Sequence, residues 1–190
     1  MKYLLVLVLV ICSSAVDAKE YWHPNNSGCF SQTLSDTLFA WEAAPELSAG
    51  GIRIAVQPDT GNGPTRLVVI DPGHGEIFGS PAVDPFLLVA VGTGRRTCVH
   101  KEPIHECPAA LSVLQSLHRQ SIPVGFQADS PALLPVIHGE TYYLDFRDGQ
   151  GNLNQWRFYG AYHPMQAVIE VSFEQLKECI SPVQASLDGR

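Results

Sequence analysis

A segment near the middle of the chain has the residue types of a metal site. Cys98, His100, His105 and Cys107 stand there in a nearly symmetrical order. Two thiolates and two imidazoles can hold zinc or copper in a tetrahedral arrangement. The same two cysteines can instead join in a short disulfide loop that leaves both histidines exposed. In an exported protein the disulfide is the favoured interpretation.

The N-terminus predicts export. Lys2 precedes an apolar run at residues 4–11, and small residues follow that end at Ala18. This order of basic, apolar and small-residue regions is typical of a secretory signal peptide, here cut after Ala18. The apolar run is shorter than the roughly 20 residues that cross a bilayer. We therefore predict a periplasmic or secreted protein.

The predicted domain organisation follows from this cleavage site. Residues 1–18 are expected to form the signal peptide, residues 19–180 a single exported β-rich domain, and residues 181–190 a flexible C-terminal tail. No transmembrane segment is expected after the signal peptide is removed.

Four cysteines remain in the mature chain, namely Cys29, Cys98, Cys107 and Cys179. In an oxidising compartment they are expected to form two disulfides, for which there are three possible connectivities. Closure between the nearby Cys98 and Cys107 is geometrically easy, and it leaves Cys29 to reach Cys179. This pairing is favoured, and it would tie the N-terminal segment to the last helix.

The composition limits the classes of partner. The chain has 12 basic and 19 acidic residues, a net charge of −7, and no basic run. It therefore does not predict binding to nucleic acid or to an anionic membrane. An acidic surface can engage a basic partner, and the association rate would then depend on salt.

Turn residues and apolar runs predict many short strands. Residues 52–56 alternate as a strand does, residues 58–64 are a dense turn signal, and residues 66–70 form a second strand that is apolar after Arg66, which predicts a β-hairpin. The Gly/Asn-rich turn at residues 148–152 predicts a second hairpin. Strands are also predicted at residues 86–91, 122–126, 133–138, 142–146, 154–159 and 167–173, and short helices at residues 35–46, 107–119 and 174–179.

These elements predict the fold class. It is mainly β, in the α+β sense: an antiparallel β-sandwich-like domain with two or three short helices and two disulfides. Residues 133–158 resemble the later strands of immunoglobulin-like and fibronectin-like domains in their order of apolar residues, paired tyrosines and Gly/Asn turn.

Residues 67–75, Leu-Val-Val-Ile-Asp-Pro-Gly-His-Gly, carry a second resemblance. They resemble the first strand and zinc-ligand loop of the zinc-dependent N-acetylmuramoyl-L-alanine amidases, which cleave peptidoglycan. The resemblance implies zinc held by His74, Glu106 and His138, with a fourth position for water. Residues 167–173 resemble the strand that carries the family's catalytic glutamate, which implies Glu170 as the general base.

Other features favour a simpler interpretation of this segment. Glu76 stands where the family has a second glycine, and the interval from His74 to Glu106 is longer than in the family. The strands predicted at residues 122–126 and 133–138 are too close in sequence for the crossover helix that parallel neighbours need. Residues 67–75 are then a strand that leaves into a Pro-Gly turn, with His74 exposed at its tip.

Other chemistry finds little support. No Gly-x-Ser-x-Gly nucleophile motif occurs, and Gly92-Thr93-Gly94 lacks the third glycine of a dinucleotide fingerprint. Trp22, Trp41 and Trp156 could form a carbohydrate-stacking surface, but aromatic residues in a β-rich domain more often belong to the core.

The leading prediction is an exported, disulfide-stabilised protein that acts by binding another protein in the envelope or the extracellular space. It would be an inhibitor, an immunity protein or an accessory protein of envelope assembly, with no catalysis and no cofactor. Loop residues 71–85 and the segment from Cys98 to Cys107 are the candidate recognition loops. The alternative prediction is a divergent zinc amidase that uses His74, Glu106, His138 and Glu170.

Overall fold

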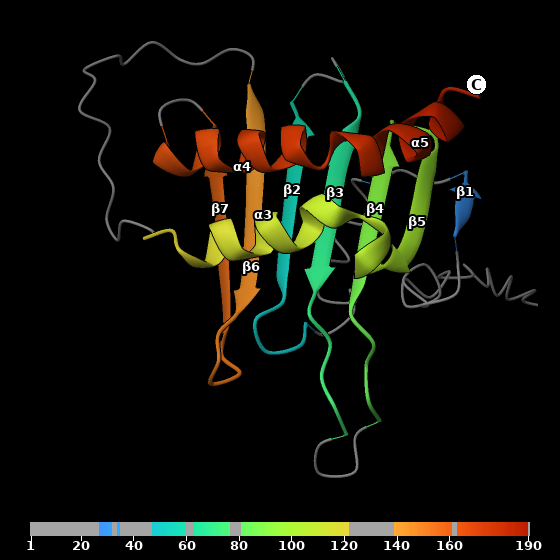
Figure 1. The fold of residues 1–190 in the computed structure, drawn as a ribbon. Helices are drawn as coiled ribbons and strands as arrows, with labels where there is room; N and C mark the ends of the chain where they lie inside the picture. Colours follow the sequence, from blue (N-terminus) through green and yellow to red (C-terminus); the bar gives the residue numbers. More distant parts are fainter. Residues whose placement is uncertain are drawn as a thin grey trace, which may run out of the picture.

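The described residues form one antiparallel sheet with helices on one face (Figure 1). The computed structural model describes residues 27–31, 34, 47–59, 63–76, 81–121, 139–160 and 163–189. The signal peptide, the helix predicted at residues 35–46 and the strands predicted at residues 122–126 and 133–138 lie outside the described residues, as do Trp22 and Trp41.

The sheet has seven strands in the order β1-β5-β4-β3-β2-β6-β7, and every neighbouring pair is antiparallel. The hairpins predicted around residues 58–64 and 148–152 are confirmed as β2–β3 and β6–β7. The strands are β1 (Gly28–Phe30), β2 (Ile52–Pro58), β3 (Thr65–Asp71), β4 (Phe86–Gly92), β5 (Thr97–Pro103), β6 (Glu140–Arg147) and β7 (Leu153–Tyr159).

Three α-helices cover one face of this sheet (Figure 1). They are α3 (Pro108–His118), α4 (Pro164–Gln175) and α5 (Lys177–Leu187), and the short 3-10 helix η2 (Ile104–Glu106) leads into α3. Ile54 and Val68 of the sheet and Ile169 of α4 are fully buried in the core between the two layers. None of the described helices is long and apolar enough to cross a membrane.

The central strands are buried on the opposite face as well. Leu67 and Leu88 belong to a second apolar cluster there, which also contains Leu34 and Leu47 from the N-terminal segment. A strand that is buried on both faces needs apolar residues at successive positions rather than at alternate ones. This explains the unbroken apolar sequence of β4.

The predicted fold class is confirmed as a mainly antiparallel β protein with short helices and two disulfides. The second sheet that a β-sandwich requires does not occur among the described residues.

The strand predicted at residues 167–173 is wrong, because this segment is part of α4. The buried residues Met165, Ile169, Ser172 and Phe173 have the three- and four-residue spacing of a helix. His163 caps the helix by accepting a hydrogen bond from the Met165 backbone N–H at 3.2 Å, and Pro164 occupies the first turn.

The tail predicted at residues 181–190 is also wrong for most of its length. Helix α5 continues through Pro182 to Leu187, and it buries Ile180, Val183 and Leu187. Two of these buried side chains, Val183 and Leu187, lie within the predicted tail, so packing holds this segment. The charged and polar residues around them conceal this in the sequence.

The predicted disulfide pairing is wrong as well. Cys29 pairs with Cys98, and Cys107 pairs with Cys179. The segment after Cys98 is the extended strand β5 rather than a loop. Five residues of strand carry the chain roughly 17 Å from Cys98 to Pro103, whereas the Cα atoms of a disulfide lie within about 7 Å. The extended strand thus carries the chain away from Cys98, and Cys98 and Cys107 are each bonded to another cysteine.

Candidate functional site

The predicted zinc ligands do not form a cluster among the described residues. His74 follows β3, makes an isolated β-bridge with Val83, and places its Nδ1 atom 2.8 Å from the Gly75 carbonyl oxygen. Glu106 ends η2, and its carboxylate lies 3.4 Å from His105 Nε2 in an exposed pair. His138 lies outside the described residues.

Glu170, the predicted base, lies at the other end of the sheet from His74. Its Oε1 atom is 2.6 Å from the hydroxyl of Tyr142, which stands in register with Val56 and, through it, with Arg66. His74 instead follows Asp71, which is roughly 17 Å further along β3. A base on Glu170 therefore cannot serve a metal that His74 and Glu106 hold.

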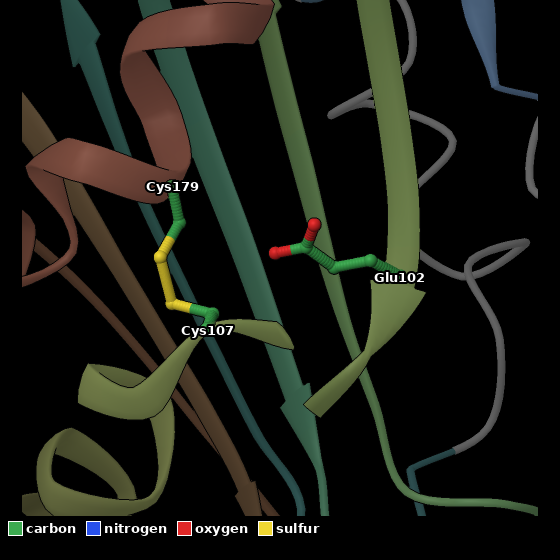
Figure 2. Close-up of side chains that lie close together, drawn as sticks. All are labelled: Glu102, Cys107 and Cys179. Atoms are coloured by element: carbon green, nitrogen blue, oxygen red, sulfur yellow. A yellow bond between two sulfur atoms is a disulfide. The ribbon is translucent and has the colours of Figure 1, made fainter. Parts of the chain in front are cut away.

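One group of three potential ligands occurs in the described part of the chain. Oxygen and sulfur atoms of Glu102, Cys107 and Cys179 lie within 4.8 Å of one another (Figure 2). The two sulfur atoms are bonded to each other in a disulfide, so neither is a thiolate that could bind a metal. In this oxidised state, the Glu102 carboxylate is the one member of the group that could bind a metal.

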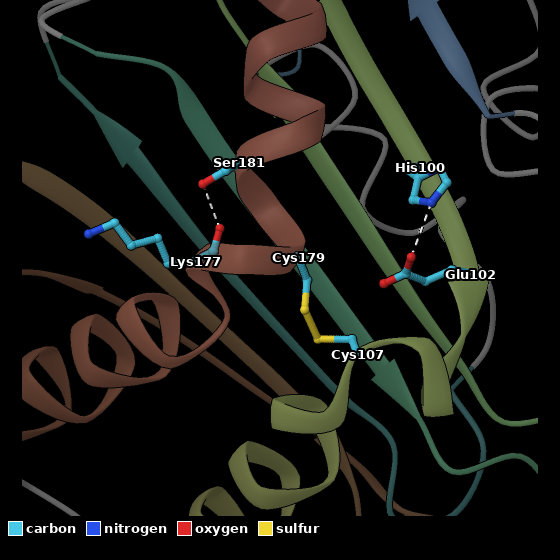
Figure 3. The surroundings of a disulfide bond; sticks show 6 residues. All are labelled: His100, Glu102, Cys107, Lys177, Cys179 and Ser181. Carbon is cyan, nitrogen blue, oxygen red and sulfur yellow. Dashed lines mark hydrogen bonds and ion pairs between the residues drawn. A yellow bond between two sulfur atoms is a disulfide. The ribbon is translucent and has the colours of Figure 1, made fainter.

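Metal binding by the Cys98–Cys107 segment meets the same obstacle, because Cys98 is bonded to Cys29. His100 Nε2 instead lies 3.2 Å from Glu102 Oε2 (Figure 3). Figure 3 also shows that Cys107 and Cys179 join the start of α3 to α5 beside this pair. The disulfide therefore links α3 to α5, and it lies next to β5.

A cleft of about 450 Å³ lies between the end of α3, the start of β2 and the end of β6. We call it the α3–β6 cleft. Its floor is apolar, and its rim carries polar and charged side chains. The floor consists of Ile52, Leu117, Leu144, Phe146 and Met165, and the rim includes His118, Gln120, Arg147 and Asp148.

Hydrogen bonds fix the rim of the α3–β6 cleft. Two backbone bonds join the strands beside it: Gly50 N–H donates to the Arg147 carbonyl at 2.8 Å, and Arg147 N–H donates to the Gly51 carbonyl at 3.0 Å. His118 Nε2 lies 2.8 Å from the Gly50 carbonyl oxygen, and the Arg147 guanidinium donates to the Gly151 carbonyl. The rim is therefore positioned before any ligand arrives.

The Asp148 carboxylate adds a negative charge to this rim. It accepts hydrogen bonds from the Asn152 side-chain amide and from the backbone N–H groups of Asn152 and Gln150. These bonds, the one from the Asn152 side chain foremost, lower the pKa of Asp148 below its ordinary value. A carboxylate and a guanidinium thus stand beside an apolar floor, which is the usual composition of a specific ligand site.

The two candidate recognition segments meet in a second recess, of about 710 Å³. Residues 82–86 line one side of it and residues 101–105 the other. The Lys101 ammonium lies 3.9 Å from the centre of the Phe86 ring. Burial lowers the pKa of Lys101, and the negative charge of Asp71 opposes that effect. The two segments that the sequence predicts as recognition loops are therefore neighbours in the structure. One of them includes strand β5 and is not a loop.

A polar network joins α4 to the sheet at the Arg66 end. The Tyr142 hydroxyl lies 2.7 Å from Glu140 Oε2 and 2.6 Å from Glu170 Oε1. Burial, followed by these two hydrogen bonds, raises the pKa of Tyr142 far above its ordinary value. The hydrogen bond from Tyr142, with another from Gln166, lowers the pKa of Glu170. The neutral Tyr142 hydroxyl therefore lies between two carboxylates, and it links Glu170 of α4 to Glu140 of β6.

Sequence reasoning missed the α3–β6 cleft. Its lining comes from four segments that lie far apart in the chain, namely the residues before β2, the end of α3, the end of β6 and the start of α4. A local signal exists only for the β6–β7 turn, whose Asp, Gly and Asn residues predict the geometry that positions Asp148.

Comparison with known proteins supplies no relative: no protein-family model, curated protein or solved structure matches this chain.

Proposed function

We propose that this chain is an exported, disulfide-stabilised binding protein that recognises another protein through the α3–β6 cleft. The observation that carries the proposal is an open cleft of about 450 Å³ with a buried apolar floor and a charged, hydrogen-bonded rim. Such a cleft fits one large apolar side chain of a partner, and pockets of this kind contribute much of the affinity at protein interfaces.

The cysteines support the exported part of the proposal. The chain has two disulfides, and disulfides persist in oxidising compartments such as the periplasm or the extracellular space. Together with the N-terminal pattern, they support a periplasmic or secreted location. An inhibitor, an immunity protein or an accessory protein of envelope assembly would each act by binding in such a compartment.

The zinc-amidase alternative receives no support from the described residues. Its proposed base, Glu170, is engaged with Tyr142 at the opposite end of the sheet from His74. The binding proposal needs no such convergence, and it uses residues that the fold does bring together.

The cleft can be tested by filling it. Ala49 is exposed and lines the cleft, so Ala49→Trp places a large ring in the recess without removing a core contact. Gln175→Trp adds the same ring at an exposed position at the end of α4, and it is the matched control. N-acetyl-phenylalaninamide serves as a probe, and binding is followed by amide chemical shifts.

We expect the probe to shift amides of the cleft in the wild type and in Gln175→Trp, and to shift none of them in Ala49→Trp. A partner captured by the wild-type protein and then purified should bind Ala49→Trp at least about tenfold more weakly than the control. Equal affinity for the two variants, or probe shifts spread evenly over the surface, would contradict the proposal.

A further inference from the structure

The Cys107–Cys179 disulfide differs from the Cys29–Cys98 disulfide in its surroundings. Each bond joins a buried cysteine to a half-buried one. A carboxylate oxygen of Glu102 lies within 4.8 Å of both sulfur atoms of the first bond, and Figure 2 shows this carboxylate directed toward them. Among the described residues, no acidic or histidine side chain approaches both sulfur atoms of the second bond in this way. The two disulfides are therefore similar in burial and different in the charge beside them.

Exposure decides which sulfur atom of the Cys107–Cys179 bond a reductant attacks. Cys107 is 0% exposed, whereas Cys179 is half-buried on α5. A thiolate that reduces a disulfide attacks one sulfur atom and expels the other as a thiolate. Attack therefore takes place at Cys179, and negative charge develops on the buried sulfur atom of Cys107.

Two features of the fold act on a thiolate at Cys107, and they oppose each other. Cys107 is the N-cap of α3, and a helix N-terminus carries about half a positive charge, which stabilises an anion. The Glu102 carboxylate carries a full negative charge within 4.8 Å of the same sulfur atom. Because a full charge outweighs a partial one, the two features together disfavour the thiolate.

No lysine or arginine pairs with the Glu102 carboxylate in the described part of the chain. Its Oε2 atom lies 3.2 Å from His100 Nε2, and that imidazole is charged only when it is protonated. The ammonium of Lys177 lies 2.9 Å from Glu174 Oε1, and Figure 3 shows its side chain directed away from the disulfide. Lys101 lies on the other face of β5, against the second apolar cluster. The negative charge beside the disulfide is therefore not cancelled by these cations.

We infer that Glu102 protects the Cys107–Cys179 disulfide against reduction by thiols, because it opposes the negative charge that Cys107 must take up. This protection keeps the bond between α3 and α5 closed where small thiols are present. It involves no residue that lines the α3–β6 cleft, so its failure would leave the proposed function standing.

Reduction by dithiothreitol has two steps, and the first is the one that Glu102 opposes. One thiolate of the reagent bonds to Cys179 Sγ, the sulfur–sulfur bond breaks, and its electron pair leaves on Cys107 Sγ, which takes a proton from water. The second thiol of the reagent then loses its proton, attacks the mixed disulfide and releases Cys179 as a thiolate, which is protonated in turn. The protein gains two electrons and two protons, and dithiothreitol becomes a cyclic disulfide.

The variant Glu102→Gln tests this inference. Glutamine has almost the same shape as glutamate, can still hydrogen-bond to His100, and carries no charge. Glu106→Gln is the matched control, because it removes the same charge from an exposed carboxylate one residue before Cys107. The oxidised proteins are treated with dithiothreitol at pH 8 and alkylated at intervals. Peptide mass spectrometry then follows the reduction of each disulfide separately.

We expect Glu102→Gln to raise the rate of reduction of the Cys107–Cys179 bond about tenfold, because a charge this close acts strongly on the leaving thiolate. Glu106→Gln should change that rate by less than about twofold, since water screens an exposed charge. The rate for the other disulfide should be the same in all three proteins. Urea unfolding of each variant verifies that the fold is retained.

An unchanged or lower rate in Glu102→Gln would overturn the inference, and so would an equal increase in Glu106→Gln. Faster reduction of both disulfides in Glu102→Gln would overturn it as well, because that pattern indicates a loosened fold rather than a local charge. A rate that does not depend on the dithiothreitol concentration would have the same consequence, since opening of the protein would then control the reaction.

Discussion

The two edges of the sheet, β1 and β7 (Figure 1), are held in different ways. Strand β1 has three residues, and Cys29 is bonded covalently to Cys98 directly opposite it on β5. Strand β7 has seven residues, and no disulfide attaches it. Three residue pairs alone would fray, so the short edge depends on a covalent bond, whereas seven pairs can hold the long edge by themselves.

The long edge is held by side chains on both faces. Phe158 lies between Tyr142 and His163, with ring centres 5.5 Å and 3.9 Å away. On the other face, Gln155 donates to Asp145, and the Arg157 guanidinium lies 5.2 Å from the centre of the Tyr143 ring. Cross-strand contacts of this kind each contribute a fraction of the stability of an edge strand.

The largest expected effect comes from removing the covalent bond at the short edge. The variant Cys29→Ala with Cys98→Ala opens a loop with a sequence separation of 69 residues, which should cost about 4 kcal/mol of unfolding free energy. In hydrogen exchange, β1 amides should open at a free energy well below that of global unfolding. The β7 amides should keep the same difference from global unfolding as in the wild type. Retained protection in β1 would mean that packing, not the disulfide, holds this edge.

At the long edge, Phe158→Ala should have the next largest effect. The ring packs against the helix-side core and stacks on Tyr142 and His163, so its loss should cost about 2 kcal/mol. Urea unfolding measures this loss. Leu153→Ala, at an exposed position of the same strand, is the control and should change the unfolding free energy by less than about 0.5 kcal/mol. Similar losses in both variants would contradict the assigned role of Phe158.

A smaller effect should follow from pH at His163, beside the same edge. Burial lowers the pKa of His163 in the folded protein. Above the unfolded pKa of about 6.5, the ring is neutral in both states and folding does not depend on it. As pH falls through that value, the unfolded chain takes up a proton and the folded one does not, so stability is lost until the folded pKa is reached.

The variant His163→Asn tests this contribution. Asparagine keeps an acceptor for the Met165 N–H and does not titrate. The fall in the urea midpoint between about pH 7.5 and pH 5.5 should be smaller in the variant than in the wild type. An equal fall in both proteins would assign the pH dependence to other groups.

The smallest effect is expected from Arg157→Gln, which removes the cation–π contact with Tyr143 at an exposed position. The loss in unfolding free energy should be about 0.5 kcal/mol, and urea unfolding measures it. A loss as large as that of Phe158→Ala would mean that the outer face, rather than the helix-side face, holds β7.

Local chemistry explains which elements the sequence predicted. The turn at residues 148–152 and the alternation in β2 predict their hairpins because both signals act between near neighbours. The sequence of α4 predicts a strand because Val168 and Val171 favour strands, and because the buried position 172 is a serine, whose Oγ donates to the Val168 carbonyl in the structure. The His163-Pro164 start was the signal that could have identified it.

The disulfide pairing and the α3–β6 cleft depend on contacts between segments far apart in the chain, so local sequence patterns do not predict them. The partner of Cys98 depends on which strand lies next to β5, and no local pattern places β1 there. The α3–β6 cleft likewise exists only because the start of β2 lies beside the end of β6, as the bonds between Gly50, Gly51 and Arg147 show. Topology therefore decides both the covalent pairing and the candidate site.

The order of the disulfides along the chain has a consequence for biogenesis. Cys29 joins Cys98, and Cys107 joins Cys179, so each bond links cysteines that are neighbours in sequence among these four. When such a chain enters an oxidising compartment from its N-terminus, Cys29 and Cys98 both arrive before Cys107 does. Oxidation in order of arrival then gives the native pairing directly, and we expect maturation to need an oxidant but no disulfide isomerase.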